Sequence, residues 1–107
     1  MNTKAAVLHK MELDRPYTES NPLKIEQVTL DDPGFNEVVV KIKAAGLCHS
    51  DLSVIDGNRP RPLPMALGHE AAGEVVALGA GVKKLALGDH VVFAFLPYCG
   101  SCSYCQT

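Results

Sequence analysis

The sequence predicts a single, mainly β domain, folded as a small barrel or sandwich with short helices. Three observations lead to this prediction. The 107 residues amount to one domain of ordinary size, short apolar segments with β-type alternation recur along them, and glycine and proline turn signals separate these segments. With 47% hydrophobic and 21% charged residues the composition is globular. We therefore expect one core that buries about two thirds of the unfolded surface.

The first three strands are expected at residues 4–9, 23–30 and 37–47. In the third, Val38, Val40 and Ile42 are predicted to share one apolar face, with Lys41 and Lys43 on the other. Before it, the sequence Asp-Asp-Pro-Gly at residues 31–34 predicts a turn, because proline fixes φ and glycine tolerates a positive φ.

A short helix is expected at residues 50–56, capped by Ser50 or Asp51 and ended by Gly57. Residues 58–64 contain three prolines and two arginines, which predicts an extended loop. Two further strands are expected at residues 68–79 and 89–96, and a knuckle at residues 97–100.

The segment Gly79-Ala80-Gly81 follows a predicted strand and begins like a dinucleotide-binding fingerprint. The third glycine of that fingerprint is absent, and too few residues follow for the helix whose N-terminus would hold a pyrophosphate. We therefore expect a turn between two strands.

Charge and hydropathy together argue against nucleic acid and membranes as partners. Twelve acidic and ten basic residues give a formal net charge of −2, and no run of Lys or Arg is long enough to follow a phosphate backbone. No apolar signal region or membrane-length apolar run is present. We expect no nucleic-acid partner, no membrane partner and a cytoplasmic location.

The four cysteines are unevenly placed: Cys48 stands alone, and Cys99, Cys102 and Cys105 form a CxxCxxC motif. In a reducing compartment this clustering favours a metal site over disulfides. Zinc or an iron–sulfur cluster would need a fourth ligand from elsewhere or from a longer chain. An iron–sulfur carrier ranks last, because the fourth cysteine and following proline of bacterial ferredoxins are missing.

Cys48 and His69 flank the proline-rich loop at the ends of predicted elements. Taken singly, a cysteine is usually a small buried hydrophobe and a histidine a satisfied polar residue. Together, a thiolate and an imidazole are the ligand types that zinc prefers.

Four motifs carry a more specific resemblance. They read GLCHSD (46–51), GHEAAGEV (68–75), GDHVV (88–92) and PYCGSCSYC (97–105). In this order they resemble the N-terminal half of zinc-dependent medium-chain alcohol dehydrogenases. The resemblance implies that residues 1–107 form an incomplete GroES-like domain, a partly open β-barrel, and that the Rossmann cofactor domain is absent from this sequence.

The resemblance also implies a role for individual residues. Cys48 and His69 match two catalytic-zinc ligands, and Glu70 matches an acidic neighbour that approaches the metal. Asp51 matches the carboxylate that accepts the other ring N–H of the ligating histidine, and Ser50 matches the hydroxyl that takes the alcohol proton. The remaining matches are His49 facing the cofactor pyrophosphate, Phe95 as an aromatic wall of the substrate pocket, and Cys99, Cys102 and Cys105 as structural-zinc ligands.

One position departs from the family pattern: Ser53 stands where many relatives have the histidine at the outer end of the proton relay. Serine cannot act as a base near pH 7. Phe95 and the loop at residues 59–64 further suggest an apolar pocket entrance.

The implied function is oxidation of a small alcohol to an aldehyde or ketone, with hydride transfer to NAD or NADP, by a protein that forms homo-oligomers when full length. The chain alone, as a fragment, is expected to be inactive. The alternative is a free-standing GroES-like zinc-binding module without catalysis.

Overall fold

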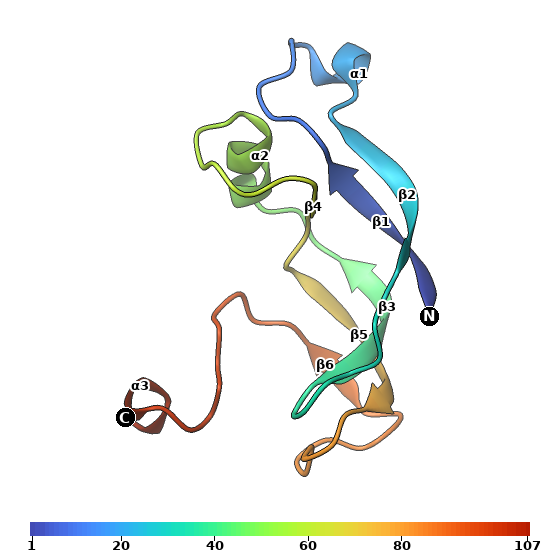
Figure 1. Cartoon of the computed structure of the whole chain (residues 1–107), viewed down its shortest axis with the longest axis vertical. Helices are drawn as coiled ribbons and strands as arrows, with labels where there is room; N and C mark the ends of the chain where they lie inside the picture. The colour runs from blue at the N-terminus through green and yellow to red at the C-terminus, as the bar shows by residue number, and fades with distance from the viewer.

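A computed structural model describes all residues, 1–107, as six strands and three short helices (Figure 1). The strands are β1 (Asn2–Leu8), β2 (Leu23–Thr29), β3 (Val38–Ala45), β4 (Met65–Ala66), β5 (Ala71–Leu78) and β6 (His90–Val92). The helices are α1 (Tyr17–Ser20), α2 (His49–Ile55) and α3 (Ser103–Gln106). None of the three is long and apolar enough to cross a bilayer.

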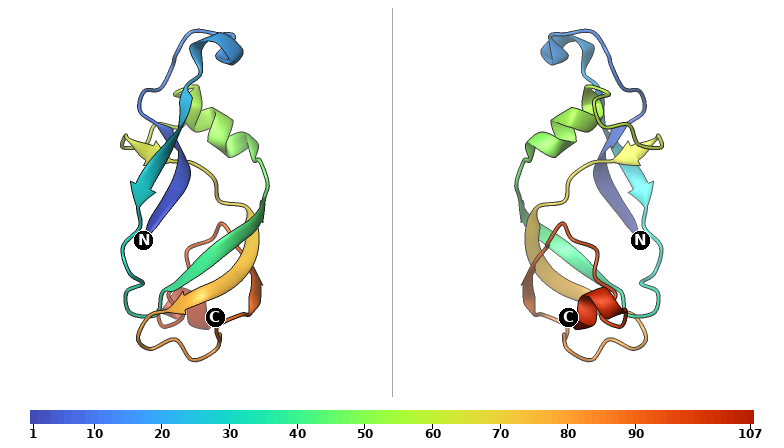
Figure 2. Two further views of the ribbon diagram at one scale, coloured as in Figure 1. Left: turned by 90° about the vertical axis from the view of Figure 1, so that its right-hand side faces the viewer. Right: turned by 90° about the vertical axis from the view of Figure 1, so that its left-hand side faces the viewer.

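The strands form two antiparallel three-stranded sheets, in the orders β2-β1-β4 and β3-β5-β6. In the first, β1 pairs with β2 from Asn2–Thr29 to Leu8–Leu23. The sheets share no strand and do not close into a continuous barrel (Figure 2). This confirms the prediction of a mainly β, partly open fold with short helices.

Four of the five predicted strands, the first to fourth along the chain, are confirmed to within three residues at each end. The fifth is wrong in length: it was predicted at residues 89–96, and β6 ends at Val92. Val92 pairs with Ala72, and the next amide, of Phe93, donates to the carbonyl of Ala71, where β5 begins. Beyond that point β5 offers no backbone for pairing. Short α1, β4 and α3 were not predicted.

The predicted apolar face of β3 is also wrong. Its buried residue is Val39, whereas Ile42 is 48% exposed. The pairing of β3 with β5 shifts register between Val39 and Val40 and again between Ile42 and Ala44. Because each shift interrupts the two-residue period of the pleat, simple alternation fails to predict which side chains face inward.

Helix α2 lies where the sequence predicted it, but its N-cap differs. Cys48 occupies the cap in an extended conformation (φ −118°, ψ 144°), and no side chain caps the helix. The expected caps, Ser50 and Asp51, lie inside the first turn. At the other end, Gly57 adopts φ +81°, a conformation that glycine reaches without strain and that ends the helix as predicted.

The main core anchors α2 against β1. Leu8, Val54 and Ile55 form its buried cluster. Five partly buried apolar residues pack around this cluster: Met11, Tyr17, Leu23, Leu63 and Leu67. The C-terminal half of α2 is therefore held by apolar burial, which fixes the direction in which its first turn points.

A polar contact reinforces the same anchor. The Tyr17 hydroxyl and the Arg15 guanidinium both donate to the Asp56 carboxylate at the end of α2, the latter at 3.0 Å. The Tyr17 hydrogen bond, followed by Arg15, lowers the pKa of Asp56. The segment between β1 and β2 is thereby tied to α2.

The segment at residues 79–84 is a turn, as expected, and no helix follows it. The Gly79 amide donates to the Glu37 carbonyl at 2.7 Å. A Cβ atom at Gly79 would lie 1.8 Å from the Gly34 carbonyl oxygen. Glycine is needed here for close backbone approach between two turns, which accounts for the resemblance to a nucleotide fingerprint.

The domain exposes more surface than its size predicts. Its accessible surface is 8152 Å², against roughly 5,800 Å² for a folded monomer of 11.5 kDa. Only about half of the unfolded surface is buried, so the expected two thirds is wrong. Few residues are buried because the two three-stranded sheets make little contact with each other. A cavity of about 740 Å³ lies between them, and its wall includes Val39, His69 and Glu70.

Candidate metal centres and the adjoining pocket

Cys48, His69 and Glu70 converge although 21 positions separate Cys48 from His69. Their ligand atoms all lie within 4.8 Å of one another. Cys48 is held by the start of α2, and His69 and Glu70 lie on the segment that leads into β5. The structure thus brings together three residues to which the resemblance assigned metal chemistry.

A backbone contact fixes the approach of the two segments. The Gly46 amide donates to the Glu70 carbonyl at 2.9 Å, just before Cys48. A Cβ atom at Gly46 would lie 2.6 Å from the Glu70 carboxylate oxygen Oε2. The Glu70 side chain therefore occupies the space that any larger residue at position 46 would need.

Ser50 and Asp51, in the first turn of α2, surround the His69 ring. The Ser50 hydroxyl donates to Cys48 Sγ at 3.2 Å and lies 3.4 Å from His69 Nε2. On the opposite side of the ring, Asp51 Oδ1 lies 3.4 Å from His69 Nδ1. One ring nitrogen thus faces the thiol and hydroxyl, and the other faces a carboxylate.

The contacts within this cluster shift two pKa values. Hydrogen bonds from Ser50, and then from His69, lower the pKa of Cys48. The hydrogen bond to Cys48 is the largest cause that raises the pKa of His69, and the charge of Asp51 adds to it. These shifts favour a thiolate at Cys48, which is the form of cysteine that binds metals.

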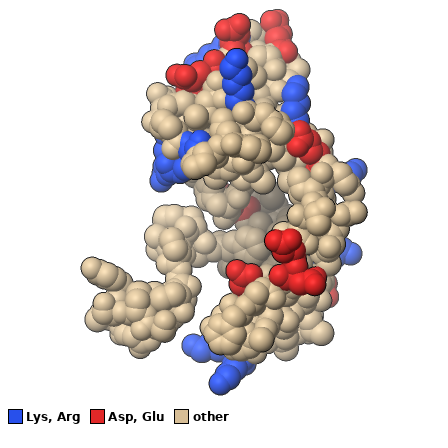
Figure 3. Space-filling view, in the orientation of Figure 1, with Lys and Arg blue, Asp and Glu red and all other residues tan.

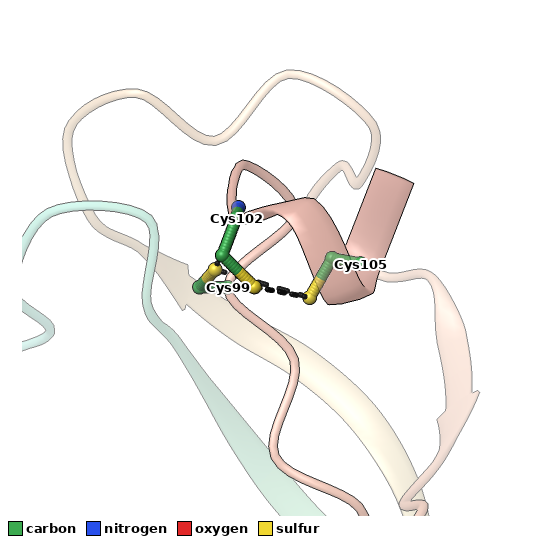
Figure 4. Close-up of side chains that lie close together, drawn as sticks. All are labelled: Cys99, Cys102 and Cys105. Atoms are coloured by element: carbon green, nitrogen blue, oxygen red, sulfur yellow. Dashed lines mark hydrogen bonds between the residues drawn. The ribbon is translucent and has the colours of Figure 1, made fainter. Parts of the chain in front are cut away.

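Cys99, Cys102 and Cys105 form a second cluster in the segment that ends in α3 (Figure 4). The Sγ atoms of Cys99 and Cys105 lie 3.8 Å apart, and those of Cys102 and Cys105 lie 3.5 Å apart. All four cysteines of the chain are free thiols. Two sulfurs bound tetrahedrally to one zinc ion at the usual bond length lie about 3.8 Å apart.

The backbone around Cys99 is shaped to receive a thiolate. The amides of Ser101 and Cys102 point at Cys99 Sγ, at 3.5 Å and 3.3 Å. Gly100, at φ +78°, allows the chain to turn in this way. These amides lower the pKa of Cys99 to about 6. Free thiolate therefore predominates at Cys99 at neutral pH.

A pocket of about 200 Å³ opens beside the first cluster. Ser50, Asp51, His69 and Phe95 line it, together with two arginines of the proline-rich loop, Arg59 and Arg61. Phe95 lines the pocket, and the entrance that was expected to be apolar is mixed, because the two arginines lie beside apolar residues. The loop at residues 59–64 was expected at the pocket entrance, but its alternation of arginine with proline was not interpreted as a source of positive charge there.

Two further residues lie near the start of α2. His49 is exposed in the first turn of the helix. The Ser53 hydroxyl donates to the His49 carbonyl at 3.3 Å, one turn back along the helix. Ser53 is therefore engaged with the helix backbone.

The donor atoms of both clusters fit zinc. Thiolate, imidazole and carboxylate are the ligands that zinc takes in proteins, and three thiolates with an outside donor match a structural site. The first cluster adjoins a pocket and the second does not contribute to it. The first cluster therefore has space beside it for a ligand, which the second cluster does not share.

Comparison with known proteins agrees with this arrangement. Residues 34–107 match the family model of the alcohol dehydrogenase GroES-like domain. The chain is 48% identical, over all of its 107 residues, to NDMA-dependent alcohol dehydrogenase of Amycolatopsis methanolica and covers 27% of that relative.

Two solved structures are similar over 99% of the chain. One is the alcohol dehydrogenase zinc-binding domain protein from Burkholderia ambifaria, with 42% identity, a TM-score of 0.85 and 26% of that chain covered. The other is benzyl alcohol dehydrogenase from Acinetobacter calcoaceticus, with 38% identity, a TM-score of 0.84 and 27% covered.

The chain therefore belongs to the alcohol dehydrogenase GroES-like domain family. The matches also confirm the resemblance to the N-terminal domain of the zinc-type medium-chain alcohol dehydrogenases. The chain spans about a quarter of the length of the relatives and structures described above.

Proposed function

We propose that these residues supply the metal-binding part of the catalytic site of an alcohol dehydrogenase. The reaction is oxidation of a small alcohol to an aldehyde or ketone: the carbinol C–H bond breaks, its hydride passes to NAD or NADP, and the hydroxyl proton leaves. The observation that supports this proposal is the convergence of Cys48 and His69 beside Ser50 and an open pocket.

In this proposal Cys48 and His69 hold a catalytic zinc ion, and Glu70 is an alternative donor. A zinc ion with an open position acts as a Lewis acid that lowers the pKa of an alcohol. Cys99, Cys102 and Cys105 hold a second, structural zinc ion.

The residues of α2 prepare the proton transfer. Ser50 lines the pocket and reaches both Cys48 and His69, so its hydroxyl is placed to take the alcohol proton. Asp51 faces Nδ1 of His69, so it holds the proton on that nitrogen and leaves Nε2 free to bind metal. Serine is not a base near pH 7, and the Ser53 hydroxyl donates to the His49 carbonyl, so the proton leaves Ser50 through water or another residue.

Four further properties belong to this proposal. His49, exposed at the start of α2, faces the cofactor pyrophosphate, and the whole protein is a cytoplasmic homo-oligomer. The 107 residues alone do not turn over alcohol, because the segment that begins like a dinucleotide-binding loop forms a turn instead. A nicotinamide cofactor must then be bound mainly by other parts of the protein.

The test compares His69→Ala and Cys48→Ser with His90→Ala in the protein expressed from its complete gene. His90 is an exposed histidine of β6 and serves as the control. We expect each of the first two variants to lose one equivalent of zinc by elemental analysis and at least a thousandfold in kcat/KM, with His90→Ala unchanged. Full zinc content and activity in His69→Ala would exclude the proposed centre.

A cobalt-substituted sample gives an independent readout. Cobalt bound at the two clusters is expected to show thiolate charge-transfer absorption, of which the part due to Cys48 is lost in Cys48→Ser while the part due to Cys99, Cys102 and Cys105 remains. Bound metal without alcohol-dependent reduction of NAD or NADP would favour the alternative, a zinc-binding module without catalysis.

A further inference from the structure

Two cationic side chains on the rim of the pocket have no acidic partner. Arg59 and Arg61 both line the pocket that holds Ser50 and His69. Three pairs of side chains lie within ion-pair distance, two of them with a histidine as partner, and neither of these arginines takes part in any of them. The only hydrogen bond of their side chains joins Arg61 to the neutral carbonyl of Pro60, at 2.9 Å.

The acidic group in the same pocket is already engaged. Asp51 lies 3.4 Å from His69 Nδ1, and its side chain is 19% exposed. The carboxylate therefore faces the imidazole, and the two guanidinium groups remain available for a ligand. Figure 3 shows Lys and Arg side chains at the edge of the molecule beside α2, on the side where the loop that follows α2 lies.

The backbone that carries the two arginines is restrained. Prolines at positions 60, 62 and 64 fix φ along the loop. At one end the Arg59 amide donates to the Ser53 carbonyl of α2 at 3.0 Å, and at the other end β4 pairs with β1. Ordering this loop around a ligand therefore costs little entropy.

Guanidinium groups of this kind recognise oxyanions. Their planar donors match a carboxylate in a bidentate geometry, and the geometry is more selective than that of lysine. The pocket, at about 200 Å³, is smaller than the usual ligand cavity of roughly 300–1,000 Å³. The space inside the pocket therefore favours a short ligand.

We propose that Arg59 and Arg61 select a short alcohol that carries a carboxylate at the end remote from its hydroxyl. The carboxylate binds at the rim, and the hydroxyl points inward to Ser50. This inference rests on the proposed dehydrogenase function. It assigns a substrate class, the short-chain hydroxy acids, that neither the motifs nor the relatives indicate.

The kinetic test uses the protein from its complete gene, with 4-hydroxybutyrate and 1-butanol as substrates of equal chain length. We expect Arg59→Gln/Arg61→Gln to lower kcat/KM for 4-hydroxybutyrate at least tenfold, mainly through KM, and to change that for 1-butanol less than twofold. Lys83→Gln, which removes an exposed cation far from the pocket in sequence, is the control and should change neither.

If the double variant loses kcat/KM equally with both substrates, or loses none with 4-hydroxybutyrate, the proposed substrate class is wrong. A change in KM for NAD or NADP with an unchanged substrate ratio would also overturn it, because the arginines would then contact a cofactor phosphate.

A binding experiment separates this inference from the proposed reaction. Butyrate, which has the carboxylate but no hydroxyl, is titrated into the same proteins at low ionic strength and followed by calorimetry. We expect saturable binding that weakens at least fivefold in the double variant and not in Lys83→Gln. Equal butyrate binding by the double variant and by Lys83→Gln would contradict carboxylate binding by Arg59 and Arg61, even if the enzyme oxidises alcohols. Butyrate binding without any alcohol oxidation would instead keep the oxyanion rim and reject the dehydrogenase function.

Discussion

The hydroxyl of Tyr17 donates a hydrogen bond to the carboxylate of Asp56, 39 positions away, where α2 ends. This contact joins the segment after β1 to the helix whose other end carries Cys48 and Ser50. A polar contact at one end of α2 thus reinforces the apolar packing of the helix whose other end carries the candidate centre.

Replacing Tyr17 with Phe removes this hydrogen bond and keeps the ring in the core. We expect the free energy of unfolding to fall by about 1.5–3 kcal/mol, as for a lost hydrogen bond to a charged partner. Urea unfolding measures the change. Tyr104→Phe is the control, since Tyr104 is 91% exposed. Equal stability of Tyr17→Phe and the wild type would contradict the proposed anchor.

The same contact makes stability depend on pH in a defined direction. The pKa of Asp56 is lowered on folding, chiefly by Tyr17 and then by Arg15. Its stabilisation is therefore fully present above the unfolded pKa, about 3.9, and is lost as the pH falls through the folded value.

Urea midpoints of the wild type and Asp56→Asn, measured from pH 7 to pH 2, test this dependence. The difference between them should be constant from pH 7 to pH 5 and should shrink below pH 4. If the difference between the two urea midpoints is unchanged at pH 2, the charge of Asp56 is not the cause of that difference.

Gly79→Ala tests the close approach of the two turns. Its Cβ atom would lie 1.8 Å from the Gly34 carbonyl oxygen, so backbone must move. We expect the free energy of unfolding to fall by at least about 2 kcal/mol, as for other large steric disruptions. In Gly88→Ala the new Cβ meets nothing within 4 Å, and only the positive φ is strained, at a cost of about 1–2 kcal/mol. A smaller loss in Gly79→Ala than in Gly88→Ala would contradict the packing.

Alkylation of the metal-free chain tests the thiolate at Cys99. Because its pKa is lowered to about 6, iodoacetamide should label Cys99 ahead of Cys102, with a pH midpoint near 6 by mass spectrometry. Added zinc should suppress the labelling of both cysteines. A midpoint near 8.5, the value of an ordinary thiol, would show that the amides of Ser101 and Cys102 do not stabilise the thiolate.

The sequence was most informative where structure is local. A short apolar segment predicted the strand at residues 4–9, alternation predicted the strand at residues 23–30, and Gly57 predicted the end of α2. Each of these depends only on neighbouring residues. The proximity of Cys48 and His69 is not local. It followed from the motif resemblance, and in the structure it depends on the contact between Gly46 and Glu70.

The errors have tertiary causes. β4 forms because the edge of β1 pairs with Met65 and Ala66, and β6 ends because β5 offers no further backbone. The N-cap of α2 was predicted at Ser50 or Asp51 but lies at Cys48. The Ser50 hydroxyl donates to the Cys48 sulfur and does not cap a backbone amide, which local sequence does not reveal. Arg59 and Arg61 were visible in the sequence, but only the folded loop directs them to the pocket.

The open arrangement of the two sheets has a calorimetric consequence. Folding removes about half of the unfolded surface from water, where a typical domain of this size removes about two thirds. The heat-capacity change of unfolding scales with that surface and is about 1.3–1.6 kcal/mol/K for an ordinary chain of this length. For these residues it should be about one fifth smaller, so their stability curve is broad and flat, and moderate cooling changes their stability little.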